Sequence, residues 1–239
     1  MYKTAVTPVR EVANTLKQTY LFRSLDGKSL RFLAAQAVEF HYKPNSILFM
    51  AGETAPGLFV LASGAVRGVR ASTNGREQVV FVERAPATVA EVPVFDDGVF
   101  TLTAIAEEST KVYFFDKALL HTLCLENPSF AMTALKVIGQ RVRTLTELVE
   151  ELSLCEVDMR LAHFLLSEAQ RRGERVNGHI HLDLNLTRSQ IATRIGTVRE
   201  VVSRKLVQMQ SEGLIELEKR HLTIKDPERF QQYAKAGKK

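Results

Sequence analysis

The chain has too few cysteines for a disulfide framework and no apolar run long enough to cross a membrane. Its 239 residues include two cysteines, Cys124 and Cys155, which cannot form a four-cysteine metal site. The longest apolar stretches, such as residues 47–51, span about five residues, whereas a membrane helix needs about 20. Residues 1–16 lack a signal-peptide core. We therefore expect a cytoplasmic protein that does not contact a membrane.

Excess positive charge is confined to the C-terminal third. Residues 1–156 carry 16 basic and 17 acidic side chains, whereas residues 157–239 carry 16 and 10. This asymmetry indicates nucleic acid or another anionic surface as the partner of that third, and a simply solvated surface is the alternative. With 45% apolar and 25% charged residues, the chain has the composition of one or two globular domains.

Short strands separated by glycines are predicted between residues 38 and 116. The pair Asn74-Gly75 is typical of a tight hairpin, because both turn positions favour a positive φ. Many short strands at this spacing predict a small β-barrel or jelly roll. A short helix capped by Asp26 is expected to open the ordered part. The strand candidates are residues 47–50, 58–61, 66–69, 78–82, 102–105 and 111–115.

A long helix follows a shorter one, 117–126, which Asn127-Pro128 ends. Ser129 is the expected cap of the long helix. The apolar residues of this helix are spaced 3, 4, 3, 4 and 3, as in a heptad seam. So narrow a seam favours parallel pairing with a second subunit, whereas packing on its own β-domain is the alternative. The seam comprises Leu135, Ile138, Val142, Leu145, Val149 and Leu152.

Two short helices with a glycine between them predict a helix-turn-helix. Thr187 caps the first, residues 188–194, and Gly196 supplies the turn. Thr197 is expected to cap the second, which begins at Val198. A helix over residues 159–171 precedes the motif, and a hairpin of strands 215–217 and 222–224 follows it as a wing.

The second helix carries a polar face suited to the DNA major groove. Arginine pairs with guanine through two hydrogen bonds, and glutamate accepts one from cytosine. The expected base contacts are Arg199, Glu200, Ser203 and Arg204, and a solvated polar face is the alternative. Hydroxyls at helix starts and basic residues of the wing suit phosphates, so the expected phosphate contacts are Thr187, Ser189, Thr197, Lys219 and Arg220.

Together these segments resemble the CRP/FNR family of bacterial transcription regulators over about residues 20–230. The resemblance implies an α+β fold with a cyclic-nucleotide-binding-like β-roll (jelly-roll-like) sensor domain, a dimerisation helix and a winged helix-turn-helix domain. Their expected bounds are 20–127, 128–156 and 157–230. The residues that carry the resemblance are Gly52-Glu53, 57–61, 64–66, Glu91, 95–98, Asn127-Pro128, 186–192, Gly196 and 199–204.

The family resemblance also implies partners and a binding site on DNA. A homodimer would read a pseudo-palindromic site in double-stranded DNA, with RNA polymerase as a further partner. The resemblance implies that Glu200 and Arg204 read the family's TGA-type half-site. Arg199 resembles a residue of the CRP branch and Ser203 one of the FNR branch, so the operator could follow either type.

The effector cassette departs from the cyclic-nucleotide pattern. Family members that bind cyclic nucleotides have Gly-Glu and, about ten residues later, Arg-Ser for the phosphate. Glu91 is kept here, but Thr101 and Leu102 stand at the Arg-Ser positions and Pro93 removes a backbone donor. A buried phosphate would face no arginine, and two aspartates would repel it, so we do not expect cyclic AMP. The pocket candidates are Glu91, Thr101 and Thr103, the aspartates are Asp96 and Asp97, and the effector is unknown.

The counts of cysteine and histidine also bear on an iron–sulfur cluster and on haem. Two cysteines exclude an iron–sulfur cluster within one chain, which needs four thiolates. Cys124 is expected to be a small buried residue, and a cross-subunit disulfide through Cys155 stays a minority alternative. Haem, and with it a haem-based gas sensor, remains an alternative, although His41 and His121 alone are no ligand set.

Two rival functions follow from the same residues. A constitutive regulator without an effector is compatible with the altered cassette. A jelly-roll metalloenzyme would need clustered ligands, and His41 is the only histidine in residues 38–116, so we do not expect an enzyme. His179, His181 and Asp183 share one face of a predicted strand, where a solvated surface is favoured over a metal site.

Overall fold

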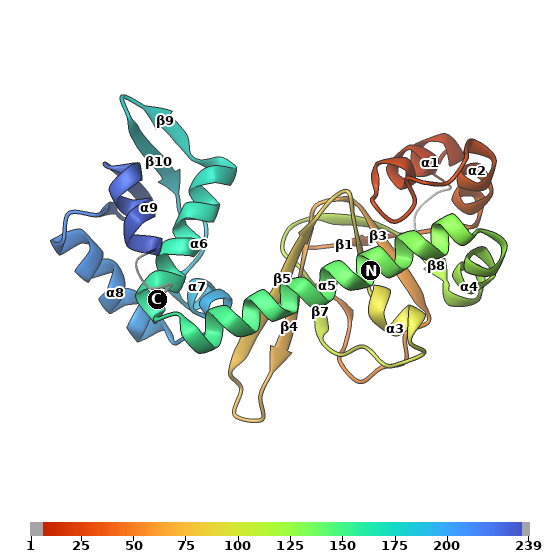
Figure 1. Ribbon diagram of the computed structural model, residues 1–239, viewed down its shortest axis with the longest axis horizontal. Helices are drawn as coiled ribbons and strands as arrows, with labels where there is room; N and C mark the ends of the chain where they lie inside the picture. The colour runs from red at the N-terminus through yellow and green to blue at the C-terminus, as the bar shows by residue number, and fades with distance from the viewer. Residues whose placement is uncertain (1–6, 236–239) are drawn as a thin grey trace. The chain divides into compact units, whose positions relative to one another are not determined.

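Two four-stranded sheets form the N-terminal part of the computed structural model, which describes residues 7–235 (Figure 1). Their strand orders are β1-β8-β3-β6 and β2-β7-β4-β5. All the predicted strand runs are confirmed, and Ala87–Val89 adds a short strand that the sequence analysis did not predict. The strands are β1 Val38–Tyr42, β2 Ile47–Phe49, β3 Gly57–Ser63, β4 Ala65–Ala71, β5 Glu77–Arg84, β6 Ala87–Val89, β7 Thr103–Ala106 and β8 Thr110–Asp116.

Alternation along β3 separates two hydrophobic cores. Phe59 and Leu61 belong to a buried cluster that includes residues of both sheets. Leu58 and Val60 point the other way, into a cluster shared with the helices α1 (Val9–Gln18), α2 (Gly27–Gln36), α4 (Lys117–Glu126) and α5 (Pro128–Leu154). Because a strand's side chains alternate between its two faces, one nearly continuous apolar run serves both cores.

The helical layer begins earlier in the chain than the sequence analysis predicted. Helix α1, Val9–Gln18, precedes α2, Gly27–Gln36, so the expectation that the helix after Asp26 opens the ordered part is wrong. Val12 and Leu16 are buried one turn apart on α1, a spacing too short to stand out in the sequence. Residues 1–6 belong to the segment 1–16 that lacks a signal-peptide core, and they lie outside the described part of the chain.

The long helix α5, Pro128–Leu154, starts one residue before its expected cap. Ser129 lies inside the helix, and the side chain of Asn127 instead accepts the backbone N–H of Phe130 at 3.1 Å. Proline fits the first turn because its missing N–H would have no partner there. Helix α4, Lys117–Glu126, ends just before Asn127, as predicted.

The chain divides into two compact units, and the division falls within α5. The first unit comprises the residues up to Ser72 together with Val80–Leu145, and the second comprises Thr73–Val79 and the residues from Thr146 onward. No helix within residues 7–235 is both long and apolar enough to span a membrane.

The second unit is a winged helix built on one apolar core. Its four-stranded sheet has the order β11-β12-β10-β9, and buried residues from α6, α7, α8 and α9 pack together with that sheet. The predicted helix pair and wing are confirmed, whereas β9 and α9 were not predicted. The elements are α6 Val157–Arg172, β9 Glu174–Val176, β10 His179–Asp183, α7 Arg188–Ile195, α8 Arg199–Ser211, β11 Glu216–Glu218, β12 His221–Ile224 and α9 Pro227–Lys235.

Candidate functional site

Helix α7 is fixed at both ends by local chemistry. Thr187 and Gln190 form a capping box, in which each side chain satisfies a backbone N–H of the other residue. Gly196 ends the helix with a φ of 66°, a conformation that glycine adopts without strain. The turn that separates the two helices is therefore specified by residues 187, 190 and 196.

Helix α8 begins without the expected side-chain cap. Val198 occupies the cap position and the helix starts at Arg199, so the prediction that Thr197 caps it is wrong. The first N–H groups of α8 therefore have no side-chain acceptor at the cap. Free N–H groups at a helix start suit a phosphate.

The predicted base-contacting side chains lie on the outer face of α8. Arg199, Glu200 and Arg204 are exposed and Ser203 is half-buried. The buried residues of α8 are Val202, Leu206 and Met209. Within the part of the chain that the structure describes, none of these four polar side chains forms a hydrogen bond or ion pair. The helix thus presents polar groups whose hydrogen-bonding capacity is unused.

Predicted phosphate contacts lie at two places in the second unit. Ser189 is exposed in the first turn of α7, and Thr197 is half-buried before α8. The hydroxyl of Thr187 is already engaged in the capping box, which leaves it less free for a phosphate. Lys219 and Arg220 are exposed at the wing turn, where Lys219 has a φ of 56°.

A buried arginine, not foreseen from the sequence, holds the turn between the two helices. Arg160 of α6 is 8% exposed, and its Nη1 donates to the carbonyl of Ile195 at 2.6 Å and to that of Gly196 at 3.3 Å. These carbonyls lie at the end of α7, where backbone acceptors lack helical partners. Arg160 therefore stabilises the turn that positions α8 after α7.

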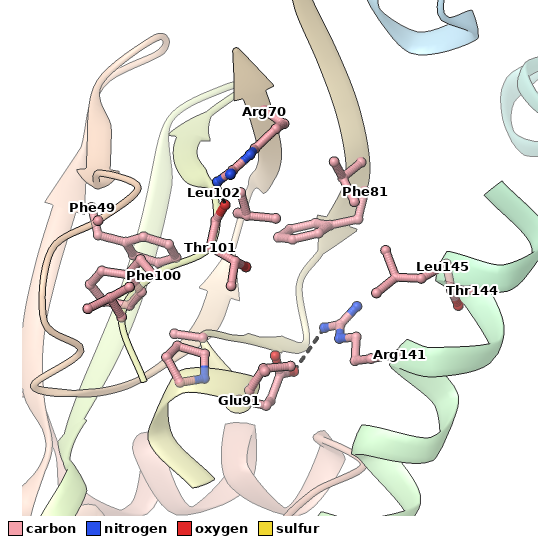
Figure 2. Close-up of a pocket in the computed structure, with 16 residues that line it drawn as sticks. Phe49, Arg70, Phe81, Glu91, Phe100, Thr101, Leu102, Arg141, Thr144 and Leu145 are labelled. Carbon is pink, nitrogen blue, oxygen red and sulfur yellow. Dashed lines mark hydrogen bonds and ion pairs between the residues drawn. The ribbon is translucent and has the colours of Figure 1, made fainter. Parts of the chain in front are cut away.

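In the first unit, a cavity of about 550 Å³ opens beside α3, Glu91–Phe95 (Figure 2). Glu91 and Thr101 of the predicted pocket residues line it, together with residues of β4, β5 and α5. Thr103 is not among the lining residues, and its hydroxyl accepts the N–H of Ala51 at 3.2 Å.

Glu91 is held in the cavity wall by an ion-pair network. Its side chain accepts hydrogen bonds from the Thr88 hydroxyl and, at 2.9 Å, from Arg141 Nη2. Arg141 also pairs with Glu83. Burial alone would lower the pKa of Arg141, but the two carboxylates outweigh that effect and raise the pKa above its ordinary value. Figure 2 shows this arginine reaching from α5 towards α3.

Arginine is present at the cavity, contrary to the expectation that a buried phosphate would face none. Arg70 lines the cavity from the end of β4, and its guanidinium donates to the carbonyl of Thr101. Pro93 also lines the cavity, whereas Asp96 and Asp97 are not among the lining residues. Their carboxylates are engaged elsewhere, with the N–H of Gly98 and with Lys117.

The remaining candidate ligands lie away from the cavity. His41 contacts Glu39 at 2.6 Å, and His121 contacts the carbonyl of Val94 at 2.7 Å. Burial raises the pKa of the Cys124 thiol, which packs against the helical core.

Histidines on the sheet of the second unit share one face, as predicted. His179, His181 and Asp183 alternate with buried neighbours on β10, and His221 of β12 lies beside His181. Across residues 7–235, no group of three histidine, cysteine, aspartate or glutamate side chains is arranged to hold a metal ion.

Most of the predicted heptad seam on α5 is uncovered. Leu135 and Val149 are 63% and 64% exposed, while Ile138 and Leu152 are half-buried. Val142 and Leu145 are also exposed, and Leu145 additionally lines the cavity. A row of exposed aliphatic side chains on one helix is a surface that favours association.

Comparison with protein families matches both units. Residues 159–233 match the Crp-like helix-turn-helix domain, and residues 39–127 match the cyclic nucleotide-binding domain. A CRP-like cAMP-activated global transcriptional regulator of Mycobacterium tuberculosis is 26% identical over 220 residues, which is 92% of this chain and 98% of that protein. The transcriptional activator protein FnrA of Stutzerimonas stutzeri is 27% identical over 77% of this chain and 75% of that protein.

Solved structures show the same fold. A transcriptional regulator of the Crp/Fnr family from Eubacterium rectale aligns with a TM-score of 0.75 at 23% identity, over 90% of this chain and 97% of that one. A CooA variant from Carboxydothermus hydrogenoformans aligns with a TM-score of 0.71 at 23% identity, over 98% of both chains.

Proposed function

The chain belongs to the CRP/FNR family of transcription regulators, and we propose that it acts as a homodimer that reads a pseudo-palindromic DNA site. The observation that carries the proposal is the outer face of α8, where Arg199, Glu200 and Arg204 are exposed and unpaired within the described residues. Arginine and glutamate at the start of a recognition helix match the hydrogen-bonding edges of G·C pairs in the major groove.

Pairing through α5 would supply the second copy of this reading surface. A helix with an uncovered row of leucine and valine side chains buries apolar area when it packs against an identical helix. Two copies related by a two-fold axis would present two recognition helices to half-sites about one DNA turn apart, roughly 34 Å. The paired seam is therefore the geometric basis for a palindromic operator.

The cavity is the proposed site of an effector. Thr144 and Leu145 of its lining lie on α5, the helix that carries the proposed dimer seam, so a ligand there would contact the dimerisation helix. A ligand that fits one arrangement of that helix better than another shifts the population towards it. Such a shift would change how well the two recognition helices match the groove, and RNA polymerase is the proposed partner of the DNA-bound form.

The test is binding of the purified full chain to two labelled duplexes of equal length. One contains a palindrome with TGA half-sites and the other a scrambled sequence of the same composition. Fluorescence anisotropy at about 150 mM salt should favour the palindrome by about 10³-fold or more in affinity. Mass photometry should show two chains per duplex. Equal affinity for both duplexes would contradict the proposal. If substitutions of the residues that line the cavity leave the specific binding unchanged, the effector-independent regulator is favoured.

A further inference from the structure

The cavity of the first unit has a wall made largely of apolar and aromatic side chains. The rings of Phe49 and Phe100 stack with their centroids 3.9 Å apart. Phe81 and Leu102 lie on the side that leads to Arg70, and Leu145 enters from α5 (Figure 2). A space of about 550 Å³ lies within the range that small-molecule sites occupy. Such a wall favours a ligand with a flat apolar ring.

Charges at the inner end of the cavity are already balanced. Glu91 is 3% exposed and accepts hydrogen bonds from Thr88 and Arg141. Arg141 is shared in turn with Glu83. Because each of these charged groups already has a partner of opposite charge, a ligand gains little by bringing an ion to this end.

The other end of the cavity holds a cation without a counter-charge. Among the described residues, no acidic side chain lies within ion-pair distance of Arg70, whose one hydrogen bond is to the carbonyl of Thr101. Arg70 is exposed, and a guanidinium has five N–H donors, so most of its donors face solvent and make no hydrogen bond within the protein. A carboxylate can take two of them at once.

We propose that the effector is a small aromatic monoanion, whose ring lies against Phe81 and Leu102 and whose carboxylate pairs with Arg70. This inference rests on the proposed function, in which the cavity is the effector site. A cyclic nucleotide fits the wall less well, because its ribose and base bring several polar groups. The lining offers few polar side chains that are not already paired, chiefly Thr101 and Thr144.

The experiment measures ligand binding to the full chain by calorimetry, independently of DNA. Naphthalene-2-carboxylate, benzoate and biphenyl-4-carboxylate serve as probes, and 2-naphthalenemethanol is the uncharged counterpart of the first. At least one carboxylate should bind with a Kd below about 1 mM. Naphthalene-2-carboxylate should bind about tenfold more tightly than the alcohol, the size expected for a charge-assisted pair.

Matched variants assign that preference to one side chain. Arg70→Gln should lower the affinity for the carboxylate about tenfold and leave that for the alcohol within about twofold. Arg67→Gln removes a guanidinium from the same strand, where it lies 3.9 Å from Glu107 and does not line the cavity, and should change neither. Arg70→Lys keeps the charge without the fork and should give an intermediate value.

The inference is overturned by any of three results. These are no carboxylate binding below about 1 mM, an unchanged preference in Arg70→Gln, or tighter binding of cyclic AMP than of every carboxylate. Failure of the DNA test together with Arg70-dependent carboxylate binding would remove the proposed function alone. Specific DNA binding without carboxylate binding would remove the inference alone.

Discussion

Arg141 of α5 donates to Glu91 of α3 at 2.9 Å, and this contact ties the long helix to the wall of the cavity. Glu91 is 3% exposed, so its carboxylate has little access to water. A buried charge that loses its partner is strongly destabilising, whereas removal of both partners costs much less. The pair therefore links the fold of the first unit to the position of α5, the helix proposed to dimerise.

Arg141→Met should lower the free energy of unfolding by about 2–3 kcal/mol, because Glu91 is left buried without its cation. The double variant Arg141→Met, Glu91→Gln should recover part of that loss, because the buried charge is removed while Glu83 still lacks its cation. Urea denaturation followed by circular dichroism measures both, and Arg143→Met serves as the exposed control on the same helix. Additive losses in the double variant would show that the two side chains are not coupled.

Charge placed on the seam of α5 should prevent dimerisation. In Leu135→Glu, Val149→Glu, four carboxylates would meet across the proposed interface, where leucine and valine otherwise bury apolar area. Sedimentation velocity should give a monomer for this variant and a dimer for the wild type. Lys136→Gln, Arg143→Gln changes the net charge by the same −2 off the seam and should stay dimeric; a monomer there would mean that net charge alone is responsible.

Alanine substitutions at Gly196 and Gly213 distinguish the cost of backbone strain from the cost of side-chain crowding. Both have a positive φ, 66° and 68°, but a Cβ on Gly196 would lie 2.4 Å from Leu152 and 2.9 Å from Arg160, whereas one on Gly213 meets nothing within 4 Å. Gly213→Ala should cost about 1 kcal/mol from strain, and Gly196→Ala about 2–3 kcal/mol because packing must also shift. Thermal unfolding compares the two, and equal losses would contradict the crowding.

Tyr233 should make stability depend on alkaline pH. Burial first, and then the charges of Asp158 and Glu212, raise the pKa of Tyr233 to about 12. The unfolded chain loses this proton near pH 10, so the tyrosine's contribution is complete below pH 10 and is lost as the pH rises towards 12. Urea midpoints between pH 8 and 11.5 should fall more steeply for the wild type than for Tyr233→Phe. Parallel curves would contradict the shift.

Periodicity in the sequence predicted the elements that pack by regular spacing. The strand runs, α4, the helix pair around Gly196 and the wing follow from apolar alternation and turn residues, and the structure confirms them. Local capping was less predictable. Asn127 caps α5 in place of Ser129, because several polar residues near that helix start compete for the cap position. Helix α8 begins one residue later than expected, so the apolar Val198 and not Thr197 stands at its cap position.

The cavity residues could not be read from the effector cassette alone. Val69 pairs with Thr103 across the β4–β7 ladder, and this register brings Arg70 beside Thr101 although 31 positions separate them in the chain. Arg141 reaches Glu91 from 50 positions away. Such pairings are set by sheet order and helix packing, so neither arginine stands at the cassette spacing in the sequence.

The central claim is that the first turns of α8 read bases, and selection from random duplexes tests it most directly. The wild-type chain should enrich one pseudo-palindrome from a random library. Glu200→Ala and Arg204→Ala should each lose about 1–3 kcal/mol on that site and relax the preference at defined base pairs. Lys219→Ala in the wing should weaken binding to all sequences alike. If Glu200→Ala and Arg204→Ala instead lose equal affinity for selected and scrambled DNA, the assignment of α8 as the reading helix is contradicted.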